Sequence, residues 1–158
     1  MSTHVTEPRK LLSRPERQRV ILDGAAHAFA RAGFAATSMA DVAAASGITK
    51  LIVYRHFESK SELYRAVLER TFARMGHELR RGLEAAQPGA GPRAVLVVGR
   101  EQPDGLRLLL RHAPREPDFA DYAHALRLRV VQGLSQRMTH IDGRFRRWAA
   151  EVAISYVF

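Results

Sequence analysis

The sequence predicts an all-α protein, and three observations support this fold class. Capping boxes, in which a serine is followed three residues later by an acidic residue, occur at Ser13–Glu16, Ser38–Asp41 and Ser59–Glu62. After each of them, apolar residues recur at the three- and four-residue spacing of an amphipathic helix. Strand signals are almost absent, because the apolar run at 94–98 is short and has no partner hairpin.

Composition narrows the class of protein. The chain has 158 residues, of which 46% are hydrophobic, so a packed core is expected and generic disorder is excluded. It has no cysteine, which excludes disulfide scaffolds, cysteine-bound zinc and thiol catalysis. No apolar run reaches the roughly 18 residues of a spanning helix, and the N-terminus lacks the apolar segment of a secretory signal. We therefore expect a soluble, cytoplasmic protein.

The charge balance is basic. Lys and Arg total 25 and Asp and Glu total 16, which gives a net charge of +9. This excess predicts a polyanionic partner, although composition alone does not distinguish nucleic acid from an acidic membrane surface.

Caps and helix breakers place the expected elements along the chain. The first four helices are predicted at about 13–32, 38–46, 49–56 and 59–86. Gly33 and Gly47 end the first two, since glycine is the usual residue after a helix. The cluster at 87–92 (Gln-Pro-Gly-Ala-Gly-Pro) predicts the main internal linker. Beyond it, helical pieces are expected at 93–100, 103–112, 117–138 and 141–158.

The segment 13–57 has the pattern of a helix-turn-helix unit. Gly47 supplies the turn between two short helices, and Ala43, Ile48 and Val53 supply apolar contacts that lock them together. The second helix of such a unit lies in the major groove of DNA. The residues on its outer face, several of which can contact phosphates or base edges, are Thr49, Lys50, Leu51, Ile52, Tyr54, Arg55 and His56.

The start of the next helix adds a second feature to this unit. Ser59 and Lys60 stand where backbone N–H groups and the helix dipole together favour a phosphate.

The spaced motifs of this region resemble the DNA-binding region of TetR-family transcriptional repressors. The motifs are Phe34–Ala43, Gly47–Lys50, Val53–Phe57 and Lys60–Leu63, and the resemblance covers about residues 14–70. It implies an all-helical homodimer that binds a palindromic operator and releases it when a small effector binds. By the same resemblance, the phosphate-contacting residues would be Thr37 or Ser38, Tyr54, His56 and Lys60, while Thr49, Lys50 and their neighbours would face bases.

Domain organisation and function follow from this resemblance. We expect a flexible N-terminal arm at 1–12, a three-helix DNA-binding domain at 13–58, and a helical-bundle domain for effector binding and dimerisation at 59–158. The leading hypothesis is a ligand-responsive transcriptional repressor of double-stranded DNA operators. An activator and a ligand-independent regulator stay open. From a different class, a basic amphipathic helical protein that binds an acidic membrane or a partner protein is the alternative.

Two positions depart from the family pattern. After Thr49-Lys50 the family usually has a small residue and then a polar one, whereas this chain has Leu51 and Ile52. We predict that they contact thymine C5-methyl groups, the main apolar feature of the major groove. The alternative is that one of them turns inward and packs against the core. Operator binding by the variant Ile52→Ala tests this, because an unchanged preference at every thymine would contradict it.

Nothing in the sequence indicates an enzyme, a metal site or a cofactor. The seven histidines form no i,i+4 pair and no HExxH motif, and the chain has no GxGxxG or P-loop pattern. The pair Asp118 and Asp121 is explained by its place at a helix N-terminus. We therefore expect no catalytic residues, no metal and no cofactor.

The C-terminal half contains apolar residues that could line an effector pocket. The candidates are Met75, Leu79, Leu109, Phe119, Tyr122, Leu126 and Trp148. Tyr122 and Trp148 are the preferred two, because each also carries a polar atom. The alternative is that these residues form an ordinary bundle core. An effector of apolar character is expected.

The length is short for the family that the motifs resemble. Such regulators usually carry two further long C-terminal helices, which form a four-helix dimer interface, while this sequence stops in the apolar run Ile154–Phe158. We expect that residues are missing, both internally and at the end. An intact mass equal to that of the printed sequence would contradict this expectation.

Overall fold

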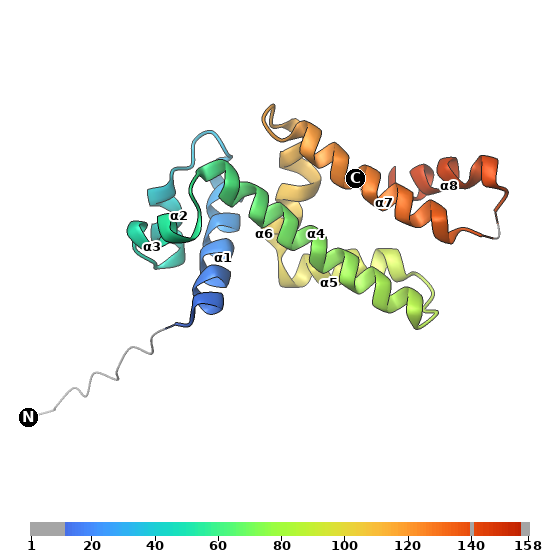
Figure 1. Cartoon of the computed structure of the whole chain (residues 1–158), viewed down its shortest axis with the longest axis horizontal. Coiled ribbons are helices and arrows are strands. Elements are labelled where there is room, and N and C mark those ends of the chain that lie inside the picture. The colour runs from blue at the N-terminus through green and yellow to red at the C-terminus, as the bar shows by residue number, and fades with distance from the viewer. Residues whose placement is uncertain (1–11, 140, 156–158) are drawn as a thin grey trace, which may run out of the picture.

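The computed structural model describes residues 12–139 and 141–155, and every regular element in this part is helical (Figure 1). The predicted arm, apart from residue 12, and the last three residues lie outside the described part. The helices are α1 (Arg14–Ala32), α2 (Met39–Ser46), α3 (Lys50–His56), α4 (Lys60–Glu84), α5 (Ala90–Glu101), α6 (Pro103–Arg107), α7 (Ala120–Arg137) and α8 (Gly143–Ser155). The prediction of an all-α fold is thus confirmed.

The first two helices begin and end as their caps predict. Ser13 N–H donates to Glu16 Oε2 at 2.7 Å and Ser13 Oγ accepts from Glu16 N–H at 3.4 Å, which is the expected capping box. Gly33 after α1 and Gly47 after α2 have φ angles of 82° and 62°. Both lie in the region of backbone space that glycine enters without steric cost.

The third expected capping box is only half present. Ser59 Oγ accepts from Glu62 N–H at 3.1 Å, as predicted for the start of α4. The Glu62 carboxylate, however, accepts from the backbone N–H of Glu58 rather than of Ser59, at 2.6 Å. The carboxylate thus pairs with the N–H one residue before the N-cap of α4.

The predicted linker at 87–92 is shorter than expected. Gly89 takes a left-handed conformation, with φ 69°, and α5 begins directly after it at Ala90. Pro92 lies in the first turn of α5, where its missing N–H leaves no bond unmade. The breakers therefore mark the start of a helix as well as the end of one.

The helix predicted at 103–112 changes its winding along its length. α6 is followed by a π-helical turn at Leu108–His112 and a 3-10 turn at Ala113–Arg115. Ala113 N–H donates to Leu108 O, five residues earlier. Pro114 has no N–H to continue an α-helical ladder, which accounts for the end of regular α-helix here.

The core joins the two expected domains. One large cluster of buried residues extends from α1 to α7 and includes Phe29, Phe34, Tyr64 and Phe119. A second, small cluster lies between α7 and α8 and is built on Val131, Ala150 and Ile154. Figure 1 shows the corresponding arrangement: α1–α3 form one end of the molecule, the long α4 runs away from them beside α5, and α7 and α8 form a hairpin.

Within residues 12–139 and 141–155, no helix combines the length and the apolar character needed to cross a membrane.

Candidate nucleic-acid interface

Hydrogen bonds hold both ends of α2. Ser38 and Asp41 form the expected capping box at the start of α2, with Ser38 N–H donating to Asp41 Oδ2 at 2.8 Å and Asp41 N–H donating to Ser38 Oγ at 3.2 Å. After Gly47, Ile48 N–H donates to Ala43 O at 3.1 Å. This last bond closes the turn that leads into α3.

α3 presents one outward face. Lys50, Leu51, Tyr54 and Arg55 are exposed, while Val53 on the opposite side is fully buried. The Lys50 ammonium lies 5.8 Å from the centre of the Tyr54 ring, one turn away. Two cations, a phenol and a leucine therefore share the exposed face of α3. A short helix can place such a face in the major groove of DNA.

The two unusual apolar residues of α3 point in different directions. Leu51 is 65% exposed. Ile52 is half-buried and packs against the main core. For Ile52, the alternative of inward packing is the one that the structure shows, so Ile52 leaves the set of candidate base contacts.

Thr37 also leaves the set. Its side chain is buried, and its hydroxyl donates to Gly33 O at 2.7 Å and lies 3.3 Å from Ala28 O. The hydroxyl thus satisfies carbonyl groups at the end of α1, so it does not face solvent where a phosphate would lie. Of the two residues that the resemblance offered, Ser38 is the exposed one.

Thr49 and Ser38 occupy the N-cap positions of α3 and α2. Thr49 is exposed and makes no capping bond through its side chain. Ser38 is exposed too, and its hydroxyl donates to Asp41 Oδ2 at 2.7 Å. Both hydroxyls stand at helix N-termini, where a phosphate is favoured electrostatically.

The surroundings of His56 include two residues that the sequence motifs did not indicate. Partial burial, followed by the charges of Arg14 and Arg17, lowers the pKa of His56 below its ordinary value. The first turn of α1 therefore brings two arginines close to the end of α3. They add positive charge beside His56, and no motif signal in the first helix pointed to them.

Lys60 is committed to the fold more than its motif position suggested. Its ammonium donates to Phe34 O at 2.8 Å and to Ala35 O at 3.3 Å, and it lies 4.4 Å from the centre of the Phe34 ring. Lys60 thus joins the start of α4 to the turn between α1 and α2. Its charge still contributes to the field at this end of the molecule.

The seven residues proposed to line an effector pocket differ in how far they are buried. Met75, Leu109, Phe119 and Leu126 are buried in the main core, which is the alternative that the sequence left open. Leu79 and Tyr122 are half-buried beside it. Trp148 lies on the surface of α8 with 67% of its area exposed, apart from the buried candidates.

Two surface hollows lie elsewhere. One, of about 270 Å³, is formed where α5 meets α6 and the π-helical turn, by Gly99, Pro103, Leu106, Arg107, Leu110 and Arg111. The other, of about 540 Å³, lies between α1 and α2 and is lined mainly by alanines, with His27, Arg31 and Asp41 among its polar residues. None of the seven predicted pocket residues lines either hollow.

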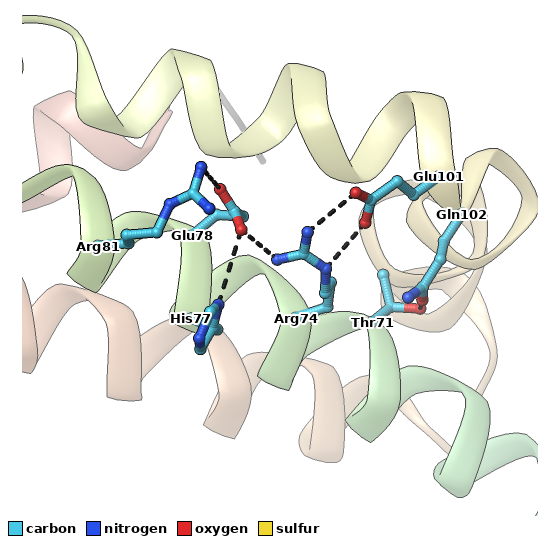
Figure 2. Close-up of polar contacts among 7 residues, drawn as sticks. All are labelled: Thr71, Arg74, His77, Glu78, Arg81, Glu101 and Gln102. Atoms are coloured by element: carbon cyan, nitrogen blue, oxygen red, sulfur yellow. Dashed lines mark hydrogen bonds and ion pairs between the residues drawn. The ribbon is translucent and has the colours of Figure 1, made fainter.

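A polar cluster connects α4 to the end of α5 (Figure 2). Arg74 Nε and one terminal nitrogen donate to the two oxygens of Glu101 at 2.8 and 2.9 Å. Arg74 also pairs with Glu78, whose carboxylate is buried and lies 3.4 Å from Arg81 and 3.6 Å from His77. One turn away, Thr71 Oγ1 donates to Gln102 Oε1 at 3.1 Å. These contacts therefore fix the orientation of α4 relative to the α5–α6 elbow, the junction of these two helices at Gln102.

In the part of the chain that the structure describes, no three His, Asp or Glu side chains gather as metal ligands would.

Comparison with known proteins relates this chain to one protein family. Residues 21–67 match the family model described as bacterial regulatory proteins, tetR family. A transcriptional repressor of Mycobacterium tuberculosis is 34% identical over 139 residues, which cover 84% of this chain and 71% of that repressor. The transcriptional activator FasR of Mycolicibacterium smegmatis is 42% identical over 59 residues, which are 37% of this chain and 27% of FasR. The curated relatives are named as regulators of transcription rather than as enzymes.

Solved structures share the fold. A TetR-like regulator from Rhodococcus sp. RHA1 superposes with a TM-score of 0.74 at 24% identity, over 92% of this chain and 81% of that one. AibR, crystallised in complex with isovaleryl coenzyme A and operator DNA, superposes with a TM-score of 0.69 at 23% identity, over 90% of this chain and 84% of AibR. The family match, the long alignment to the mycobacterial repressor and the shared fold agree: the chain belongs to the TetR family of bacterial transcriptional regulators.

Proposed function

We propose that this protein is a ligand-responsive transcriptional repressor that binds a palindromic operator as a homodimer. The observation that carries the proposal is the outward face of α3, where Lys50, Tyr54 and Arg55 are exposed while Val53 anchors the helix in the core. Ser38 and Thr49 at the two helix N-termini add phosphate contacts, as do Arg14 and Arg17 beside His56. A protein with this role acts in the cytoplasm.

The domain organisation proposed for this function divides the chain at about residue 58. Residues 13–58 hold the DNA-reading helices, and residues 59–158 form the domain for the effector and for the second subunit. AibR, whose structure contains both isovaleryl coenzyme A and operator DNA, supports the idea that one fold accommodates both partners. The effector of this chain, in this proposal, is a small molecule of apolar character that binds within the domain of residues 59–158.

Transmission from the effector to DNA runs through α4 in this proposal. α4 starts at Lys60, which is bonded to the α1–α2 turn, and reaches the α5–α6 elbow through Arg74 and Thr71. The Phe119 ring, at the start of α7, lies 4.7 Å from that of Phe34 in the same turn. An effector acts only if it binds the released and DNA-bound states with different affinity. In this proposal, the contacts named above are the ones that change between the two states.

The test is DNA binding by the purified chain. Footprinting on palindromic promoter fragments is expected to show a protected site, and its affinity should fall steeply with salt because phosphate contacts release counterions. The variant Lys50→Ala/Arg55→Ala should weaken binding and flatten the salt dependence. Arg100→Ala, which removes an exposed charge on α5, is the control and should bind as the parent does.

The outcome separates the classes of function. Absence of protection at any sequence, even at low salt, contradicts the proposal. Binding only to vesicles of acidic lipid would favour the membrane-binding alternative instead. If the operator is bound, transcription from it in vitro distinguishes repression from activation, the role named for FasR. Mass spectrometry of small molecules that copurify with the protein identifies the effector class.

A further inference from the structure

Leu51 is an unusual residue to find exposed on the recognition helix. It is 65% exposed, and with Tyr54 it is one of two large hydrophobic residues exposed in the described part of 13–58. The other aliphatic residues of α3, Ile52 and Val53, pack inward. Leu51 is therefore not needed for the fold, and it presents apolar area at the surface where this helix meets its partner.

The neighbours of Leu51 indicate which partner covers it. Lys50 precedes it and Arg55 lies one turn further along the same face, so the leucine is flanked by two exposed cations. Such a pattern fits a surface with phosphates on both sides and an apolar group between them. The major groove of DNA offers this arrangement, since thymine is the base that presents a methyl group there.

We propose that Leu51 determines operator sequence by packing against a thymine C5-methyl group. This inference rests on the proposed operator binding and adds the chemistry of one contact. A leucine side chain has no donor or acceptor, so it cannot read the polar edges of guanine, cytosine or adenine. It favours thymine because the methyl group replaces water at its exposed surface.

The experiment removes the same methyl group from the DNA and the leucine from the protein. First, the parent protein selects bound sequences from a random duplex library. Then each thymine of the enriched site is replaced singly by deoxyuracil, which keeps base pairing and loses the methyl. At the contacted thymine we expect binding to weaken about fourfold, the equivalent of one buried methyl group.

The protein variants complete the cycle. Leu51→Ala should bind the parent site more weakly and should show no further loss when that thymine becomes deoxyuracil. Leu96→Ala is the matched control, because Leu96 is 63% exposed on α5, and it should keep the fourfold effect. Since Leu51 is exposed, its truncation leaves the fold intact, which a urea unfolding curve verifies.

The outcomes distinguish this inference from the proposed function. Failure to enrich any sequence overturns operator binding and this contact with it. Enrichment without sensitivity to deoxyuracil at any thymine overturns the contact alone. A fourfold loss that persists in Leu51→Ala also overturns it, because another residue would then read the methyl group.

Discussion

Tyr64 lies where the DNA-binding helices meet the C-terminal helices. Its side chain is buried among three aromatic rings, with ring centres of Phe29, Phe34 and Phe119 at 5.0, 5.2 and 4.4 Å. Its hydroxyl has no hydrogen-bond partner in the described part of the chain, and burial raises the pKa of this hydroxyl well above its ordinary value. A buried hydroxyl without a partner costs about 1–3 kcal/mol of stability.

Removal of this hydroxyl should therefore stabilise the protein. We expect Tyr64→Phe to raise the free energy of unfolding by about 1 kcal/mol, because the ring contacts stay and the unpaired polar atom goes. Urea unfolding measures the change. Tyr64→Leu, which also removes the ring, is the comparison and should destabilise. A loss of stability in Tyr64→Phe would mean that the hydroxyl has a partner, such as a buried water.

Side-chain direction is the property that the sequence predicted least well at this scale. Leu51 and Ile52 are adjacent apolar residues on a helix of seven residues, too short for its apolar stripe to define an inner face. Thr37 occupies a motif position that implied a phosphate contact, yet its hydroxyl closes the end of α1. Arg14 and Arg17 approach His56 only through tertiary packing, which no local pattern reports.

At the scale of elements, α1 and α2 approach each other closely at Gly24. A Cβ atom at this position would lie 2.6 Å from Ser46 Cβ and 2.7 Å from Ser46 N, closer than atoms pack. The sequence shows a glycine inside a helix, where it is expected to weaken the helix. The structure supplies the reason for it, since the glycine lets the backbone of α2 reach α1.

Two alanine substitutions should therefore have opposite effects. We expect Gly24→Ala to destabilise the protein by about 1–3 kcal/mol, because α2 must move to relieve the overlap. Gly133→Ala in α7, where an added Cβ meets nothing within 4 Å, should stabilise by about 0.5–1 kcal/mol. Urea unfolding of both variants gives the comparison. Equal stabilisation in the two would show that α1 and α2 are not in close contact.

Glu78 links helix packing to pH. Hydrogen bonding from Arg74, followed by the nearby charges of Arg74 and Arg81, holds the pKa of this carboxyl below its ordinary value. A carboxyl whose pKa is lowered by folding binds fewer protons in the folded state. Its contribution is therefore present above its unfolded pKa of about 4.3 and is lost as the pH falls below that value.

The variant Glu78→Gln should remove this contribution. At pH 7 we expect its melting temperature to lie below that of the parent, and the difference should shrink as the pH falls from about 5 towards 3. Thermal unfolding followed by circular dichroism across this range measures both. Glu84→Gln, on the same helix and exposed, is the control and should track the parent at every pH. A constant difference between Glu78→Gln and the parent would argue against the ion pair with Arg74.

Helix boundaries were predictable where capping residues within one turn determine them. They were less predictable where tertiary packing determines them. Ser13, Ser38, Gly33 and Gly47 set α1 and α2 as predicted, since capping acts within one turn of the backbone. The start of α5 at Ala90 and the π-helical turn after α6 were not predicted. There the winding depends on how the segment packs on α1 and α4, which apolar periodicity does not report.

At the scale of the whole molecule, the α7–α8 hairpin is the feature that bears on how two subunits would assemble. The α7–α8 hairpin has its own small cluster, apart from the main core. The exposed side of α8 carries Phe145, Trp148 and Val152, which are 55%, 67% and 38% exposed. Their spacing of three and four residues places them along one stripe of the helix. We predict that the second subunit of the proposed homodimer covers this stripe.

The stripe can be tested apart from DNA binding. We expect the parent chain to sediment as a dimer at micromolar concentration, and Trp148→Glu to sediment as a monomer, because the substitution puts a charge where an aromatic side chain would be desolvated. The main core should be unaffected, since Trp148 lies outside it, and an unchanged circular dichroism spectrum would verify this. Leu96→Glu, which adds the same charge at a 63% exposed leucine on α5, should stay dimeric. If Leu96→Glu dissociates and Trp148→Glu does not, the subunits meet through α5 rather than α8.

A dimer joined through α8 sets the distance between its two recognition helices, which must match the 34–36 Å between successive major grooves. The same monomeric variant should therefore also lose most of its affinity for a palindromic site while keeping its salt dependence per half-site.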